Sequence, residues 1–163
     1  MIINYSTHSN MNKYLYSLLL LIATLTVGCG GDTLQGDIDD IRERLTEEGL
    51  ISDAQETPEG VFIVTHTPGN GVDFPSPTQT VNIRYTGRLF EEGTIFDMTT
   101  GTDPSQLNLQ NVIEGWRIGI PLLSKGEKAD LYIPSSLAYG QFDRAGIPGG
   151  SILVFEVELI SFF

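Results

Sequence analysis

The sequence predicts an α+β domain in which an antiparallel β-sheet wraps around one short α-helix, preceded by a short N-terminal helix. Segments rich in β-branched and aromatic residues, bounded by turns that contain Gly and Pro, indicate at least four strands. Only two stretches repeat apolar residues at helical spacing, so helices form a small part of the fold. The 163 residues, 40% of them hydrophobic, suffice for one domain with appendages.

The first 28 residues are expected to be a signal peptide, outside the folded domain. Residues 11–29 read MNKYLYSLLLLIATLTVGC, in which Lys13 precedes an apolar run. The run, at about 13 residues, suits the core of a signal peptide and is short for a ~30 Å hydrocarbon layer. We expect translation to start at Met11, because residues 1–10 contain no basic residue and no apolar period.

Cys29 follows small residues at the end of this run, and the pattern resembles a bacterial lipoprotein signal. The resemblance implies a lipid on Cys29, attachment to a membrane through that lipid, and a location in the bacterial cell envelope, in the periplasm or at the outer membrane. Two alternatives stay open, an ordinary secretory signal with a chance cysteine and a transmembrane anchor. A basic patch does not supply the anchor, because an acidic chain is repelled by anionic head groups.

Composition excludes several classes of function. The chain has 21 acidic against 9 basic residues, a net charge of −12, which argues against a nucleic-acid partner. Its single cysteine excludes an intramolecular disulfide and zinc sites built on paired cysteines. Two histidines, His8 and His66, are too few for a His-rich metal centre. We therefore expect no metal and no cofactor, and we expect His66 on the surface of a strand.

Three parts should follow the signal peptide. Residues 29–36 are rich in Gly and polar residues and are expected to form a tether that carries the lipid. Residues 37–59 should form a short helical extension, which ends in the turn-rich stretch 56–60. The main domain is then expected to span residues 60–163.

The helix of the extension is expected over residues 37–50. Ile38, Ile41 and Leu45 repeat at helical spacing, and Gly49 is a candidate C-cap. So few apolar residues cannot stabilise an isolated helix. The helix therefore either packs on the main domain or offers its apolar face to a partner.

The strands of the main domain are predicted from alternation and β-propensity. They are expected at residues 61–67, 80–90, 128–134 and 152–163. In the second of these, Val81, Ile83 and Tyr85 fall on one face. A helix is expected within residues 112–124, and Pro121 should break it or end it.

Three segments of this domain resemble the FKBP-type peptidyl-prolyl cis-trans isomerases in order and spacing. They are VNIRYTGRLFEEGTIFD at 81–97, NVIEGWRIGIPLLSKGEKADLYIPSSLAYG at 111–140 and GIPGGSILVFEVEL at 146–159. The resemblance extends over residues 60–163. It implies an FKBP-like fold and an isomerase that acts, without a cofactor, on Xaa-Pro bonds of proline-containing polypeptides in the cell envelope. Because the chain has no long dimerising helix, we expect a monomer.

The resemblance also implies the site. The positions it marks as catalytic are Tyr85, Asp97, Ile113 and Tyr139, and those it marks as substrate-binding are Phe96, Val112, Trp116, Ile147 and Phe155. In the family, the indole at the position of Trp116 forms the floor of the proline pocket. The backbone N–H at Ile113 is offered to a bound carbonyl, and the hydroxyl at Tyr139 bonds the ligand.

This set of residues suits the reaction, because rotating an Xaa-Pro amide needs no nucleophile and no metal. The barrier of ~18–20 kcal/mol comes from amide resonance, and a dry pocket with a few fixed donors favours the twisted amide over the planar one. On pattern alone, however, Tyr85, Phe96, Trp116 and Phe155 fit a hydrophobic core as well as a ligand site.

Two departures from the family pattern keep a second function open. Ser105 stands where the family usually has a further pocket phenylalanine. No basic residue lies between Met98 and Pro104, where the family often has an arginine that pairs with the aspartate at the position of Asp97. The alternative to catalysis is therefore a weak or inactive FKBP-fold module that binds peptides, or acts as a chaperone, on a lipid anchor.

Overall fold

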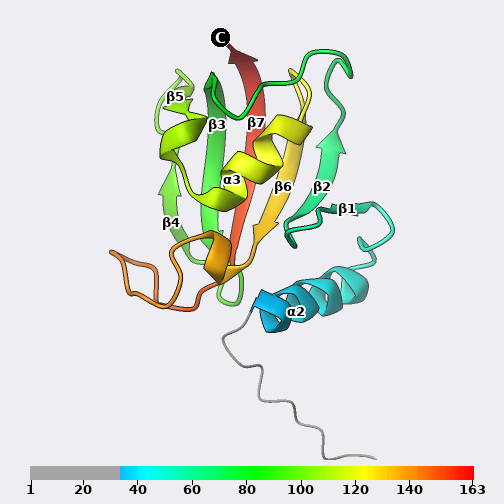
Figure 1. Ribbon diagram of the computed structural model, residues 1–163, viewed down its shortest axis with the longest axis vertical. Helices are drawn as coiled ribbons and strands as arrows, with labels where there is room; N and C mark the ends of the chain where they lie inside the picture. The colour runs from blue at the N-terminus through cyan, green and yellow to red at the C-terminus, as the bar shows by residue number, and fades with distance from the viewer. Residues whose placement is uncertain (1–33) are drawn as a thin grey trace, which may run out of the picture. The chain divides into compact units, whose positions relative to one another are not determined.

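The computed structural model describes residues 34–163, so the expected signal peptide and Cys29 lie outside the described residues. These residues form an antiparallel sheet of seven strands with helices on both faces (Figure 1). The strands are β1 (Ala54–Glu56), β2 (Phe62–Thr67), β3 (Thr80–Leu89), β4 (Ile95–Met98), β5 (Ser105–Asn108), β6 (Lys128–Ile133) and β7 (Leu153–Phe162). The helices are α2 (Leu34–Glu47) and α3 (Glu114–Gly119), with short 3₁₀ turns η1 (Leu109–Asn111), η2 (Ile120–Leu122) and η3 (Ser135–Leu137). The predicted fold class is confirmed.

The strands follow the order β1-β2-β6-β7-β3-β4, and β5 pairs with β3 beside β4. The two ten-residue strands β3 and β7 lie next to each other at the centre of the pairing. Both edges of the sheet are made of shorter strands, β1 on one side and β4 and β5 on the other. In this register Gly87 lies opposite Phe155, and Tyr85 lies opposite Val157.

One face of the sheet packs against α3. The alternating residues of β3, β6 and β7 point to this face, as their pattern predicts, and form a buried cluster with Trp116 and Ile120. Gly115 allows the close approach, because a Cβ atom there would overlap the side chain of Ile133. The helix ends at Gly119 and continues as η2 through Pro121, so the predicted break at that proline is confirmed.

The opposite face of the sheet packs against α2. Ile38, Ile41 and Leu45 are buried there against Phe62 and Tyr132. The strand β2 therefore has apolar residues on both of its faces, which explains the continuous apolar run at its start. Of the two interpretations of the N-terminal helix, packing on the domain is the one that the structure has.

The helix α2 begins at Leu34, three residues before its expected start, within the stretch assigned to the tether. It ends at Glu47, three residues before its expected end. Gly49 caps it as predicted, with a φ of 73°, and the amides of Leu50 and Ile51 both donate to the carbonyl of Leu45. The second part of the expected helical extension is not helical, because residues 54–56 form β1 at the edge of the sheet.

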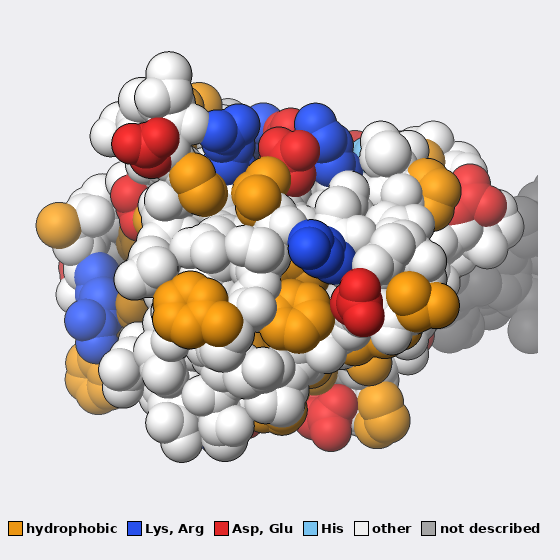
Figure 2. Space-filling view, turned by 90° about the horizontal axis from the view of Figure 1, so that it is seen from above, with side chains coloured by type: hydrophobic (Ala, Val, Ile, Leu, Met, Phe, Trp, Pro, Cys, Tyr) orange, Lys and Arg blue, Asp and Glu red, His pale blue; other side chains and the backbone are white. Residues whose placement is uncertain are grey.

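The end of the domain that carries the C-terminus also carries the loop between β2 and β3. Figure 2 shows hydrophobic side chains on this end, set among uncharged polar groups and backbone, with several basic and acidic side chains between them and at the rim. Val72 and Phe74 in this loop and Phe163 at the C-terminus are exposed. Among residues 34–163, no helix is long and apolar enough to cross a membrane.

Candidate functional site

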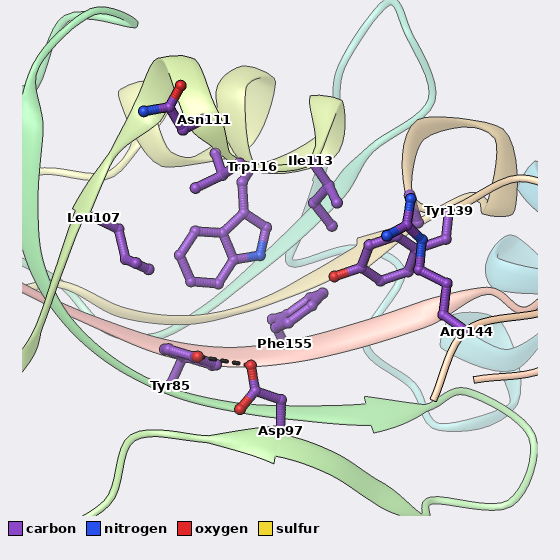
Figure 3. A pocket seen from close by; sticks show the side chains of 11 residues that line it. Tyr85, Asp97, Leu107, Asn111, Ile113, Trp116, Tyr139, Arg144 and Phe155 are labelled. Carbon is purple, nitrogen blue, oxygen red and sulfur yellow. Dashed lines mark hydrogen bonds between the residues drawn. The ribbon is translucent and has the colours of Figure 1, made fainter. Parts of the chain in front are cut away.

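A cavity of about 390 Å³ lies between α3 and the central strands (Figure 3). Its size is within the range of small-molecule and peptide side-chain sites. The residues that line it come from β3, β4, β5, η1, α3 and β7 and from the loops beside them. They are Tyr85, Asp97, Leu107, Asn111, Val112, Ile113, Trp116, Ala138, Tyr139, Arg144 and Phe155.

Three of the aromatic rings that line this cavity, those of Tyr85, Trp116 and Phe155, pack against one another. The ring centroids of Trp116 lie 5.2 Å from those of Tyr85 and of Phe155, with interplanar angles of 89° and 84°. Phe96 meets Phe155 edge to face at 5.5 Å. Gly87 permits this arrangement, because a Cβ atom there would overlap both phenylalanine rings. Edge-to-face pairs fix the rings in place and leave a rigid apolar surface.

The polar side of the cavity is a hydrogen-bonded pair. The hydroxyl of Tyr85 donates to Asp97 Oδ2 at 2.8 Å, and the Met98 amide donates to the other carboxylate oxygen at 2.9 Å. Burial raises the pKa of Tyr85 to about 12, and the hydrogen bond to Asp97 and its negative charge act in the same direction. Tyr85 is therefore a neutral donor at physiological pH, and it fixes the orientation of the carboxylate.

Three donors that line the cavity have no acceptor among the described residues. The N–H of the Trp116 indole is buried and has no acceptor, and the residue as a whole is only 3% exposed. The backbone N–H of Ile113 and the hydroxyl of Tyr139 donate no hydrogen bond to residues 34–163. Because a buried donor without a partner is unfavourable, the indole N–H favours a ligand or water oxygen in the cavity. The donors of Ile113 and Tyr139 are partly exposed and can bind an oxygen at the same place.

The position of Trp116 follows from how α3 begins. Ile113 precedes the helix in an extended conformation, with φ −61° and ψ 152°, and its carbonyl accepts the amide of Trp116 at 3.0 Å. The first turn of the helix therefore places the indole over the sheet, while the amide of Ile113 stays outside the helical hydrogen bonds.

A second hollow adjoins the cavity and shares Asp97, Tyr139 and Arg144 with it. Phe96 and Ile147 line this hollow. It extends the site along the flap, the loop between η3 and β7 (residues 138–152). A bound polypeptide can thus place one side chain in the cavity and a neighbouring one in the hollow.

Every residue that the sequence marks as a site residue in the main domain borders the cavity or the hollow. Tyr85, Asp97, Val112, Ile113, Trp116, Tyr139 and Phe155 line the cavity, and Phe96 and Ile147 line the hollow beside Asp97 and Tyr139. The remaining candidate, Cys29, lies outside the described residues.

Four residues that line the cavity were not expected from the sequence. Leu107, Asn111 and Ala138 complete its wall, and Arg144 places its guanidinium 4.9 Å from the centre of the Tyr139 ring. Asn111 stands directly before the marked pair Val112 and Ile113, and this adjacency is the one signal that could have found it. The others lie in segments whose local pattern is that of an edge strand or a loop.

Ser105 does not line the cavity. Its hydroxyl lies 3.1 Å from that of Thr99, which accepts the backbone N–H of Tyr85 at 3.2 Å. The serine therefore supports the strand behind Tyr85 through a polar contact, where the family pattern has an aromatic ring. Asp97, which lacks the expected arginine partner, has Tyr85 instead. Residues 34–163 hold no cluster of side chains suited to a metal ion.

Comparison with known families and sequences identifies the family of this chain. Residues 71–160 match the family model of FKBP-type peptidyl-prolyl cis-trans isomerases. FK506-binding protein 1A of Aspergillus fumigatus is 44% identical over 106 residues, which are 62% of this chain and 93% of that protein. The isomerase FkpA of Aeromonas hydrophila is 36% identical over 121 residues, which are 71% of this chain and 44% of FkpA.

Solved structures give the same result. A peptidyl-prolyl cis-trans isomerase from Pseudomonas syringae superposes with a TM-score of 0.66 at 33% identity, over 80% of this chain and 96% of that one. FkpA from Escherichia coli superposes with a TM-score of 0.67 at 26% identity, over 98% of this chain and 74% of that one.

Proposed function

This chain belongs to the family of FKBP-type peptidyl-prolyl cis-trans isomerases, and we propose that it rotates Xaa-Pro bonds of polypeptides in the aromatic cavity described above. The observation that carries this proposal is the combination of an apolar aromatic floor with three unpartnered donors, from Ile113, Trp116 and Tyr139. Such a cavity can bind a prolyl ring and hydrogen-bond the amide next to it, and it needs no covalent step.

The floor of the cavity lowers the barrier by replacing water. A planar Xaa-Pro amide owes its stiffness to charge separation between oxygen and nitrogen, which water stabilises. The rings of Tyr85, Trp116 and Phe155 remove that water around a bound proline, so the less polar twisted amide becomes relatively more stable.

The donors fix the rotating carbonyls. The N–H of Ile113 and the hydroxyl of Tyr139 can hold the carbonyl groups on either side of the rotating bond, because both line the cavity and neither has a partner among residues 34–163. Asp97 lies at the rim, where Tyr85 and the Met98 amide orient it. Each factor of ten in rate corresponds to ~1.4 kcal/mol of preferential stabilisation of the twisted amide.

A module that binds prolyl peptides without turnover is the second candidate. Ser105 favours it, because a serine bonded to Thr99 supplies no aromatic wall on that side of the cavity. A wider cavity would hold the proline less tightly, so that binding energy would contribute less to twisting the amide.

Peptide isomerisation separates the two candidates. We expect the full chain, in detergent micelles, to accelerate cis-to-trans conversion of short Xaa-Pro peptides, and we expect Tyr139→Phe and Asp97→Ala to reduce that rate. Tyr132→Phe is the matched control, because Tyr132 lies in the cluster on the opposite face of the sheet. If the folded wild-type chain leaves every peptide at its uncatalysed rate, the catalytic proposal is wrong and peptide binding remains to be measured.

We further propose that the enzyme acts in the cell envelope, anchored through a lipid on Cys29. The signal-like sequence of residues 11–29 supports this proposal. Expression in a bacterium with a labelled fatty acid should label the wild-type chain in the membrane fraction and leave Cys29→Ser unlabelled. A wild-type chain that is released without label, or that keeps its first 28 residues in the membrane, contradicts the lipid anchor.

A further inference from the structure

We propose that Asp37, in the N-terminal helix, is a positioning residue of the isomerase site, which it reaches through Ser135 and the turn that carries Tyr139. The inference rests on the proposed function, because it assigns Tyr139 to the reaction. Asp37 lies outside residues 71–160, the part that matches the family model, so the family pattern does not include it.

The first link is a pair of short hydrogen bonds between distant parts of the chain. The backbone N–H and the hydroxyl of Ser135 both donate to Asp37 Oδ2, at 2.7 and 2.6 Å. Asp37 is only 6% exposed and Ser135 only 2% exposed. Hydrogen bonds to a buried carboxylate are stronger than those between neutral groups, so this contact fixes the position of Ser135 relative to α2.

The second link runs from Ser135 to the residues on either side of Tyr139. The carbonyl of Ser135 accepts the amide of Ala138 at 3.0 Å and that of Gly140 at 2.8 Å. The carbonyl of Gly140 in turn accepts the amide of Gly150, at the far end of the flap. Tyr139 thus belongs to a tight turn, and within residues 34–163 the side-chain hydrogen bonds that join this turn to α2 are those between Ser135 and Asp37.

The site needs this support, because the Tyr139 side chain is only partly buried against the core cluster and no hydrogen bond within residues 34–163 holds it. Its hydroxyl has no partner among the described residues, and its ring is covered by the exposed Arg144 of the flap. Small displacements of a positioned donor reduce catalysis strongly, since the donor must lie within hydrogen-bonding distance of the twisted amide. A rigid turn beneath Tyr139 supplies that precision.

Asp37 does not owe its burial to apolar packing. The residues that attach α2 to the sheet are Ile38, Ile41 and Leu45, which fill the cluster around Phe62. An isolated carboxylate in such a place is unfavourable unless it is hydrogen-bonded, and a smaller apolar residue would serve the packing alone. The polar contact therefore suits a role in orienting the turn.

The test compares three variants of the full chain. In Asp37→Ala we expect kcat/KM for an Xaa-Pro peptide to fall about fivefold to tenfold, chiefly through kcat, while the protein remains folded. In Asp37→Asn most of the activity should return, because the amide oxygen can still accept both donors of Ser135. Ile41→Ala is the matched control on the same helix, and it should lower the melting temperature while kcat/KM of the folded protein stays within about twofold.

A double-mutant cycle tests the route through Tyr139. If Asp37 acts by positioning this residue, Asp37→Ala should have less than a twofold effect on kcat/KM in a Tyr139→Phe background. In parallel, the backbone amides of Ala138 and Gly140 should exchange hydrogen faster in Asp37→Ala than in Ile41→Ala, a readout that does not require activity.

The outcomes are separable. If wild-type protein has no isomerase activity, the proposed function fails, and the hydrogen exchange of Ala138 and Gly140 still decides whether Asp37 orders the turn. If Asp37→Ala retains wild-type kcat/KM, or if its effect adds in full to that of Tyr139→Phe, the positioning role is overturned. Equal losses of activity in Asp37→Ala and Ile41→Ala would also overturn it. The loss in Asp37→Ala would then be explained by the lower stability that both variants share.

Discussion

The two faces of the sheet differ in how completely their side chains are enclosed. On the face covered by α2, apolar side chains are enclosed, and the buried carboxylate of Asp37 has its donors in Ser135. On the face covered by α3, the aromatic cluster opens into a cavity, and the Trp116 indole N–H lacks an acceptor within residues 34–163. On the first face the protein itself supplies the packing and the hydrogen-bonding partners of these groups. On the second face the aromatic rings and the indole N–H remain available to a ligand. Stability and binding should therefore respond separately to changes on the two faces.

The largest effect is expected from a cavity on the enclosed face. Leu45 is fully buried in the α2 cluster, so Leu45→Ala should lower the free energy of unfolding by about 2–5 kcal/mol. The rate of isomerisation per folded molecule should stay within twofold, because Leu45 does not border the cavity. Urea unfolding and a peptide assay on the same samples measure both quantities. A tenfold loss of kcat/KM in fully folded Leu45→Ala would show that the faces are not independent.

A matched pair of phenylalanines sharpens the comparison. Phe155→Leu should reduce kcat/KM about tenfold, or ~1.4 kcal/mol, because Phe155 contacts the rings of Tyr85, Phe96 and Trp116. Phe62→Leu on the opposite face should destabilise at least as much, since Phe62 is fully buried, yet leave kcat/KM unchanged. The separation is contradicted if both substitutions reduce activity equally at equal stability.

Alkaline pH should affect both faces through one tyrosine each. Burial raises the pKa of Tyr85 and of Tyr132 to about 12, while an unfolded tyrosine titrates near 10. The neutral form is thus favoured in the folded state. The stability from each group is fully present below pH ~10 and is lost as pH rises through the folded value, because the unfolded chain releases its protons first.

Unfolding free energies measured between pH 8 and pH 11.5 check this prediction. The wild-type curve should be flat with respect to these two tyrosines up to pH ~10 and fall above it. Tyr85→Phe and Tyr132→Phe should each make the alkaline fall less steep, and the double variant least steep. Only Tyr85→Phe should also change catalysis. Curves of equal slope for all four proteins would rule out the assigned titrations.

The smallest effect concerns charge at the rim of the cavity. Arg144 is the one arginine of residues 34–163 whose guanidinium has no hydrogen-bonded partner, and it borders both the cavity and the hollow. Arg144→Ala should therefore reduce kcat/KM about twofold to threefold for a Glu-Pro peptide and leave a Leu-Pro peptide unaffected, with the difference shrinking in high salt. Arg44→Ala, on the α2 face, is the control and should affect neither peptide. Equal losses for both peptides would assign Arg144 to packing on Tyr139.

The main elements of the fold were predictable because their patterns are long. The alternation in β3 and β7 and the spacing of Ile38, Ile41 and Leu45 each fix which side chains are buried. The strands β1, β4 and β5 were not predicted, because three or four residues are too short to display a period. They take their conformation from the longer strands with which they pair.

The site was predictable in a different way. On pattern alone the aromatic residues read as core, and they do pack in the core cluster, so only the resemblance to a family marked them as a pocket. No local signal connects Asp37 to Ser135, which lie 98 residues apart in the chain. The contact between Arg144 and Tyr139 also has no local signal, because a loop has no periodicity from which the direction of a side chain could be inferred.

The short edges of the sheet have a consequence for a protein whose proposed substrates are polypeptides. An unfolded chain can extend an exposed sheet by adding a strand, which would trap the substrate or begin aggregation. Here β1 offers three residues at one edge, and β4 and β5 offer four each at the other, separated by a loop. Neither edge provides a ladder long enough to hold an extended segment. A substrate chain is thereby left free to leave once its proline has turned.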